Sequence, residues 1–128
     1  MNDTLSAAAR VGVHTFPVRV YFEDTDAAGI VYYANYLKFA ERARSEMLRM
    51  IGIESGTLLA EQGIVFAVRR CVAEYHKPAH LDDRLQVETW VAEIGGASLR
   101  LEQRARRDGV ILVDLDITLV CMSRDGRP

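Results

Sequence analysis

An acidic loop, followed by a glycine and the start of a helix, carries the residues whose types and spacing could do chemistry. Residues Glu23–Tyr33 read EDTDAAGIVYY, so two aspartates separated by one threonine precede Gly29 and an amphipathic run. A carboxylate placed there would face the positive end of a helix, where unpaired backbone N–H groups and the macrodipole can hold a developing oxyanion. This combination is typical of acyl transfer.

The same residues also have a structural interpretation. Asp24 and Asp26 would share one side of an extended chain, but Asp also accepts backbone hydrogen bonds in turns and caps. Gly29 either forms a turn or lets a ligand approach the backbone without a Cβ in the way. Asn35 fits a residue that caps or orients a helix start. Glu41 is a second catalytic candidate, although such a residue is ordinarily an ion-paired surface position.

Composition and charge limit the class of protein. The chain has 128 residues, of which 49% are apolar, and this is enough for one domain with one core. The formal net charge is −2, with acidic and basic residues interspersed, which argues against a nucleic-acid-binding surface. The sequence contains no GxSxG, P-loop, GxGxxG or HExxH pattern.

Cysteine usage and hydropathy indicate the compartment. Cys71 and Cys121 lie in apolar β-type runs and belong to no CxxC or Cys/His cluster, which predicts buried free thiols and no metal site. We find no segment with the features of a signal peptide and no apolar run of membrane-spanning length. We therefore expect a cytoplasmic protein without a transmembrane segment.

The spacing of apolar residues predicts an α+β domain. A helix is predicted from about Tyr33 to Ile51, where apolar or small side chains recur every three or four residues. Gly52 would end it, and a short helix is predicted over Thr57–Gln62. The expected strands are Phe16–Phe22, Ile64–Tyr75, Arg84–Glu93, Ser98–Arg107 and Val110–Met122, the last two joined as a hairpin. Residues 1–15 are expected to form a flexible tail, and residues 16–128 a single domain in which the sheet wraps the long helix.

Two segments resemble the 4-hydroxybenzoyl-CoA thioesterase branch of the hotdog-fold superfamily. The first is VRVYFEDTDAAGIVYYANY, residues 18–36, continued by ERAR at 41–44 and by Met47 and Leu48. The second joins VRR at 68–70, EYHKPA at 74–79 and LDD at 81–83. More narrowly, the chain resembles the YbgC-type acyl-CoA thioesterases associated with the bacterial Tol–Pal envelope system. The resemblance extends from about Phe16 to Met122.

The resemblance implies a hotdog fold, in which an antiparallel sheet wraps one long central helix, and an acyl-CoA thioesterase without a metal or bound cofactor. It assigns the catalytic carboxylate to Asp26 and polarisation of the thioester carbonyl to the backbone N–H of Tyr33. Asp26 would either attack the carbonyl or activate a water, and both routes stay open. Because carboxylates are weak proton acceptors at neutral pH, the nucleophilic route is slightly favoured.

The resemblance also implies partners and a substrate class. Members assemble as homodimers or homotetramers with each site at a subunit interface, and we expect short- to medium-chain acyl-CoA substrates. The expected substrate-binding residues are Gly29, Ile30, Val31 and Tyr32, with Arg69, Arg70, His76 and Lys77 as cations for the phosphates of coenzyme A. Two alternatives remain: a thioesterase acting on acyl carrier protein, and a non-catalytic acyl-thioester binding or scaffold protein.

Overall fold

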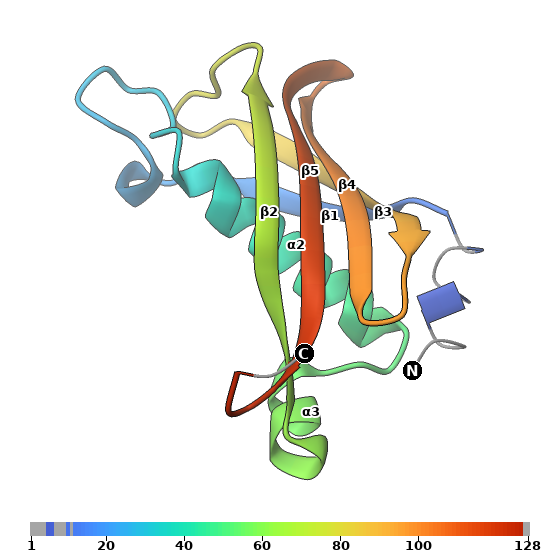
Figure 1. Cartoon of the computed structure of the whole chain (residues 1–128). Helices are drawn as coiled ribbons and strands as arrows, with labels where there is room; N and C mark the ends of the chain where they lie inside the picture. Colours follow the sequence, from blue (N-terminus) through green and yellow to red (C-terminus); the bar gives the residue numbers. More distant parts are fainter. Residues whose placement is uncertain (1–4, 7–9, 11, 127–128) are drawn as a thin grey trace.

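A curved antiparallel sheet lies across one long helix in the computed structural model, which describes residues 5–6, 10 and 12–126 (Figure 1). The strand order is β1-β3-β4-β5-β2, and each neighbouring pair is antiparallel. The elements are β1 (His14–Arg19), the 3-10 helix η1 (Phe22–Asp24), α2 (Asn35–Met50), α3 (Ser55–Gln62), β2 (Ile64–Tyr75), β3 (Arg84–Ile94), β4 (Ser98–Arg107) and β5 (Val110–Ser123). This architecture confirms the predicted α+β class.

The hairpin between β4 and β5 forms as the sequence predicts. Arg107 pairs with Val110 across the two-residue turn Asp108-Gly109, whose φ angles are 49° and 82°. Two consecutive left-handed residues match the right-handed twist of the strands that they join. Asp and Gly are among the residues that adopt this conformation most readily, so the local sequence fixes the register of the hairpin.

The apolar stripe of α2 packs on the concave face of the sheet. Its buried residues are Tyr36, Phe39, Ala40, Ala43, Met47 and Leu48. A buried amide fixes the helix in place, because Gln103 of β4 donates to the backbone O of Ala40 at 2.8 Å and to Oγ1 of Thr89 at 2.9 Å. The spacing of three and four residues that predicts the helix also places Met50 on this stripe, but Met50 is 54% exposed. It is the last residue of the helix, and its side chain extends past the covered region into solvent.

The first strand, β1, begins and ends earlier in the sequence than predicted. It begins at His14 and ends at Arg19, whereas the alternation of residues predicts Phe16–Phe22. Beyond it, the carboxylate of Asp24 accepts the backbone N–H of Tyr21 at 2.7 Å and the chain turns into η1. Phe22, predicted to be the last residue of the strand, therefore lies in η1 and is 81% exposed.

The expected tail, residues 1–15, falls partly outside the described residues. Of those that are described, Leu5 is buried in the hydrophobic core, and His14 and Thr15 belong to β1. Within the described residues, the helices are too short and too polar to cross a membrane.

An edge strand, β2, leaves apolar side chains in solvent. Val68 is 50% exposed and Tyr75 is 44% exposed, because β2 has a neighbouring strand on one side only. Cys71, for which the sequence predicts burial, is exposed for the same reason, and Cys121 on the adjacent strand is partly buried. Both thiols are free.

The turn that leads into β3 is held by an ion pair. Oδ2 of Asp83 accepts the backbone N–H of His80 at 2.8 Å and a guanidinium N–H of Arg107 at 2.7 Å. Partial burial alone would raise the pKa of Asp83, but the His80 N–H and the Arg107 charge outweigh it and hold the pKa below its ordinary value. The ionised carboxylate therefore stabilises the folded state.

Replacing Asp83 by Asn should lower the free energy of unfolding at pH 7 by about 1 kcal/mol. A carboxylate whose folded pKa is depressed contributes stability above its unfolded pKa and loses it as the pH falls through the folded value. The difference between parent and variant in urea unfolding should thus shrink below about pH 4. Asp82→Asn is the control, since Asp82 is exposed and Asn tolerates its φ of 71°. A difference that stays constant from pH 7 to pH 3 would contradict the assignment.

Candidate active site

The loop that carries Asp26 forms a tight turn. The Asp26 N–H donates to the backbone O of Ile30 at 2.9 Å, and the Gly29 N–H donates to the backbone O of Asp26 at 3.0 Å. Gly29 has a φ of 78°, which supports its role as a turn residue. The exposed Asp26 carboxylate accepts the Ala28 N–H at 2.8 Å. Its other oxygen has no hydrogen-bond partner among the described residues and is available to a ligand.

A second loop, residues 76–83, anchors this turn. The Val31 N–H donates to the backbone O of Ala79 at 2.9 Å, and the Leu81 N–H donates to the backbone O of Gly29 at 3.3 Å. These bonds form an isolated antiparallel bridge around Ile30 and His80. The acidic loop is therefore held to the segment that carries the second resemblance motif.

Two free backbone N–H groups precede α2. The helix is predicted from about Tyr33 but begins at Asn35, and Tyr33 and Ala34 form the turn before it. Among the described residues, neither the N–H of Tyr33 nor that of Ala34 donates a hydrogen bond. The Ala34 side chain cannot cap the helix, so these donors can serve an anionic or carbonyl oxygen.

Asp24 and Asn35 hold the two ends of this loop together. The carboxylate of Asp24 accepts the Tyr21 N–H, while the backbone O of Asp24 accepts the Asn35 side-chain amide at 2.8 Å and the Tyr32 N–H at 3.0 Å. Asn35 thus orients the helix start, which is one of the two roles that the sequence allows. The contacts of Asp24 are those of a residue that maintains the loop.

A cavity of about 290 Å³ lies beside the free N–H groups. Its lining residues are Ile30, Val31, Tyr33, Tyr36, Tyr75, His76, Lys77 and Pro78. It therefore brings together four of the predicted substrate-binding residues, two from each loop. Tyr32 lies outside the lining, and its ring contacts that of Tyr33 in a tilted arrangement with 4.9 Å between ring centroids.

Three tyrosine rings contribute to the cavity wall. The Tyr36 hydroxyl accepts the Ala79 N–H at 2.9 Å, and burial raises the pKa of Tyr36. Tyr75 packs between Tyr33 and Tyr36, with centroid distances of 6.1 and 5.7 Å. Sequence reasoning missed Tyr75, although it lies within the EYHKPA motif that carries part of the resemblance.

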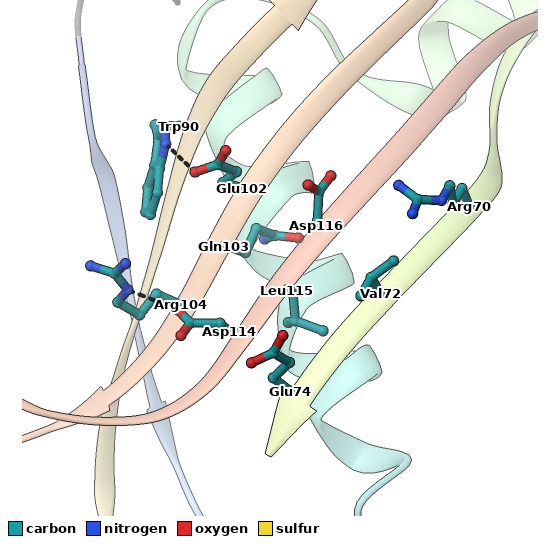
Figure 2. Close-up of a pocket in the computed structure, with 10 residues that line it drawn as sticks. All are labelled: Arg70, Val72, Glu74, Trp90, Glu102, Gln103, Arg104, Asp114, Leu115 and Asp116. Carbon is teal, nitrogen blue, oxygen red and sulfur yellow. Dashed lines mark hydrogen bonds and ion pairs between the residues drawn. The ribbon is translucent and has the colours of Figure 1, made fainter. Parts of the chain in front are cut away.

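Arg69 and Arg70 are not brought to this cavity within one protomer. Arg69 lies where the pairing of β2 with β5 shifts register. Arg70 lies on the outer face of the sheet, away from α2, where Figure 2 shows it beside a separate hollow of about 320 Å³. Charges around that hollow pair with one another, as in the Arg104–Asp114 contact at 2.9 Å. Within one chain, Arg70 therefore lies apart from the cavity, and its candidacy as a cation for coenzyme A phosphates stays a prediction.

Glu41, the second catalytic candidate, also lies apart. It is exposed on α2, where its carboxylate accepts the Ser45 hydroxyl at 3.1 Å. It lines a different depression, together with Phe16 and Arg49. The contacts of Glu41 are those of the surface position that the sequence also allows.

Comparisons with known proteins agree with this geometry. Residues 28–113 match the model of the thioesterase superfamily. The acyl-CoA thioesterase YbgC of Haemophilus influenzae is 47% identical over 108 residues, which cover 84% of this chain and 79% of that protein. The crystal structure of a probable thioesterase from Bartonella henselae aligns with a TM-score of 0.86 and 34% identity, covering 91% of this chain and 96% of that one.

A further solved structure is a 4-hydroxybenzoyl-CoA thioesterase mutant, with one Asp replaced by Asn, in complex with 4-hydroxybenzoyl-CoA. It aligns with a TM-score of 0.84 and 26% identity over 91% of this chain and 88% of that one. Together these similarities confirm the hotdog fold expected from the sequence.

Proposed function

We propose that this chain, which belongs to the thioesterase superfamily, hydrolyses acyl-CoA thioesters to a carboxylate and free coenzyme A. The observation that carries the proposal is one anchored loop with an available carboxylate oxygen on Asp26 and a free N–H on Tyr33. That loop also borders a largely apolar cavity. The YbgC name of the Haemophilus influenzae relative supplies the coenzyme A thioester as the substrate class.

The proposed chemistry starts with polarisation of the thioester carbonyl by the Tyr33 N–H. In the nucleophilic route, a carboxylate oxygen of Asp26 bonds to the carbonyl carbon, the C–S bond breaks and the coenzyme A thiolate leaves. Water then hydrolyses the mixed anhydride and restores Asp26. In the general-base route, Asp26 takes a proton from water as the water oxygen bonds to the carbonyl carbon; the C–S bond then breaks, and the proton passes from Asp26 to the departing thiolate. In both routes the N–H stabilises charge on the carbonyl oxygen.

The 4-hydroxybenzoyl-CoA thioesterase neighbour supports an aspartate in this role, because its Asp-to-Asn mutant was crystallised with the thioester bound. On the substrate side, His76 and Lys77 line the cavity, and the Lys77 ammonium supplies a cation. His76 is paired with Asp114 at 2.9 Å, whereas Lys77 has no ion-pair partner among the described residues. We therefore assign Lys77 the first contact with a coenzyme A phosphate.

Assembly belongs to the same proposal. The edge strand β2 carries unpaired backbone groups and exposed apolar side chains, and such edges pair readily with a second chain. We propose a homodimer, or a homotetramer built from dimers, joined through β2. The free thiols of Cys71 and Cys121 fit a reducing cytoplasm.

The assembly proposal predicts that the protein is at least dimeric by light scattering at micromolar concentration. Val68→Glu places a charge on the β2 edge and should shift the mass towards the monomer. Val110→Glu, at the exposed β4–β5 turn, is the matched control and should leave the mass unchanged. A parent protein that is monomeric and fully active would contradict assembly through β2.

The substrate proposal predicts a preference for short to medium acyl chains. Three tyrosine rings wall the cavity, so butyryl- and hexanoyl-CoA should have a higher kcat/KM than palmitoyl-CoA. The screen should include 4-hydroxybenzoyl-CoA and a hexanoyl acyl carrier protein, which tests the alternative carrier. If palmitoyl-CoA gave a kcat/KM about tenfold above that of hexanoyl-CoA, the preference would be wrong.

The catalytic proposal predicts that Asp26→Asn lowers kcat by at least about a hundredfold, near 3 kcal/mol in the barrier. The substitution keeps the size of the side chain but removes the charge that either route requires. Asp24→Asn is the matched control and should keep turnover while lowering the thermal midpoint, because Asp24 bonds to the loop backbone. A folded Asp26→Asn protein whose kcat is within about threefold of the parent value would contradict the catalytic role of Asp26.

A further inference from the structure

A tyrosine of the edge strand reaches across to the turn that precedes α2. The Tyr75 hydroxyl donates a hydrogen bond to the backbone O of Tyr33 at 3.2 Å. Within the described part of the chain, no other hydrogen bond joins β2 to residues 32–36. The ring of Tyr75 also meets that of Tyr33 edge-on. The strand therefore contacts the turn through one ring and one hydroxyl.

The acceptor of this bond, the Tyr33 oxygen, belongs to the peptide group that also carries the free N–H of Ala34. The C=O of Tyr33 and the N–H of Ala34 lie in one planar unit, so fixing the oxygen fixes the direction of the N–H. A hydrogen bond at the oxygen also polarises the peptide group and strengthens its N–H as a donor. The other donor to this oxygen, the Tyr36 N–H, is 3.4 Å away, which leaves the hydroxyl as the shorter contact.

The hydroxyl keeps its proton over the working range of pH. Partial burial raises the pKa of Tyr75, and the neighbouring Cys71 and Tyr33 raise it further. Tyr75 is thus a donor towards the Tyr33 carbonyl at neutral pH. A phenylalanine at this position would keep the ring contacts and lose only this donor.

We propose that Tyr75 is a positioning residue for thioester hydrolysis, whose hydroxyl holds the Tyr33–Ala34 peptide group so that the Ala34 N–H joins the Tyr33 N–H at the thioester carbonyl. The inference rests on the hydrolysis proposed at Asp26. Tyr75 does not touch the reacting atoms and acts through the turn. Because the carbonyl oxygen carries more charge in the transition state than in the substrate, a misaligned turn should lower kcat and leave KM nearly unchanged.

The kinetic test separates the hydroxyl from the ring. Tyr75→Phe should lower kcat on the best acyl-CoA about fivefold to tenfold, with KM and the thermal midpoint close to those of the parent. Tyr75→Leu should lose at least as much kcat and also raise KM, since the cavity wall changes. Tyr21→Phe, an exposed tyrosine outside the cavity, should behave as the parent. If Tyr75→Phe matches the parent and only Tyr75→Leu loses activity, the role is packing and the inference is overturned.

A second readout needs no turnover. In assigned NMR spectra of the ligand-free protein, Tyr75→Phe should shift the Ala34 amide proton upfield, because the peptide group loses its polarising bond while the ring current stays. An unchanged Ala34 resonance together with a parental kcat overturns the inference. If Asp26→Asn loses a hundredfold while Tyr75→Phe stays parental, only the role of Tyr75 falls. If the parent hydrolyses no thioester, both proposals fall.

Discussion

The site depends on two loops that hold one another through main-chain hydrogen bonds. Val31 bonds to Ala79, and Leu81 bonds back to Gly29, although neither loop belongs to a regular element. Backbone N–H and C=O groups that are constrained in a fold need hydrogen-bond partners. Here the two loops supply those partners to each other, as neighbouring strands do in a sheet. The second loop is fixed in turn to β4 by the Asp83–Arg107 ion pair. The sheet therefore determines, through these two loops, where the Asp26 carboxylate lies relative to α2.

The helices and strands can be predicted from the sequence because the spacing of apolar residues differs between a helix and a strand. The helical stripe and the strand alternation predict α2 and β2–β5 to within a few residues. The end of β1 could not be predicted, since apolar alternation continues through Val20 to Phe22. What turns the chain away from β3 is a contact that spacing does not reveal: the carboxylate of Asp24 accepts the Tyr21 N–H at 2.7 Å, and the chain enters η1.

The two resemblance motifs predicted part of the lining of the candidate cavity, whereas residues placed by packing were not predicted. The resemblance pointed to Ile30, Val31, His76 and Lys77, and these four residues line one cavity. Arg70 lies apart from this cavity in the single chain because Arg70 and Tyr75 are an odd number of residues apart along β2 and so face opposite sides of the sheet. Alternation counted back from Tyr75 along β2 predicts that Tyr75 and Arg70 face opposite sides of the sheet.

The central claim is that the Tyr33 N–H binds the thioester carbonyl while Asp26 faces its carbon. A crystal structure of the Asp26→Asn protein with hexanoyl-CoA tests it most directly, since the variant should bind the substrate without cleaving it. We expect the acyl group in the cavity beside Tyr36 and the carbonyl oxygen about 3 Å from the Tyr33 nitrogen. A bound thioester whose carbonyl oxygen meets some other donor, with residue 26 turned away from the carbon, would contradict the account.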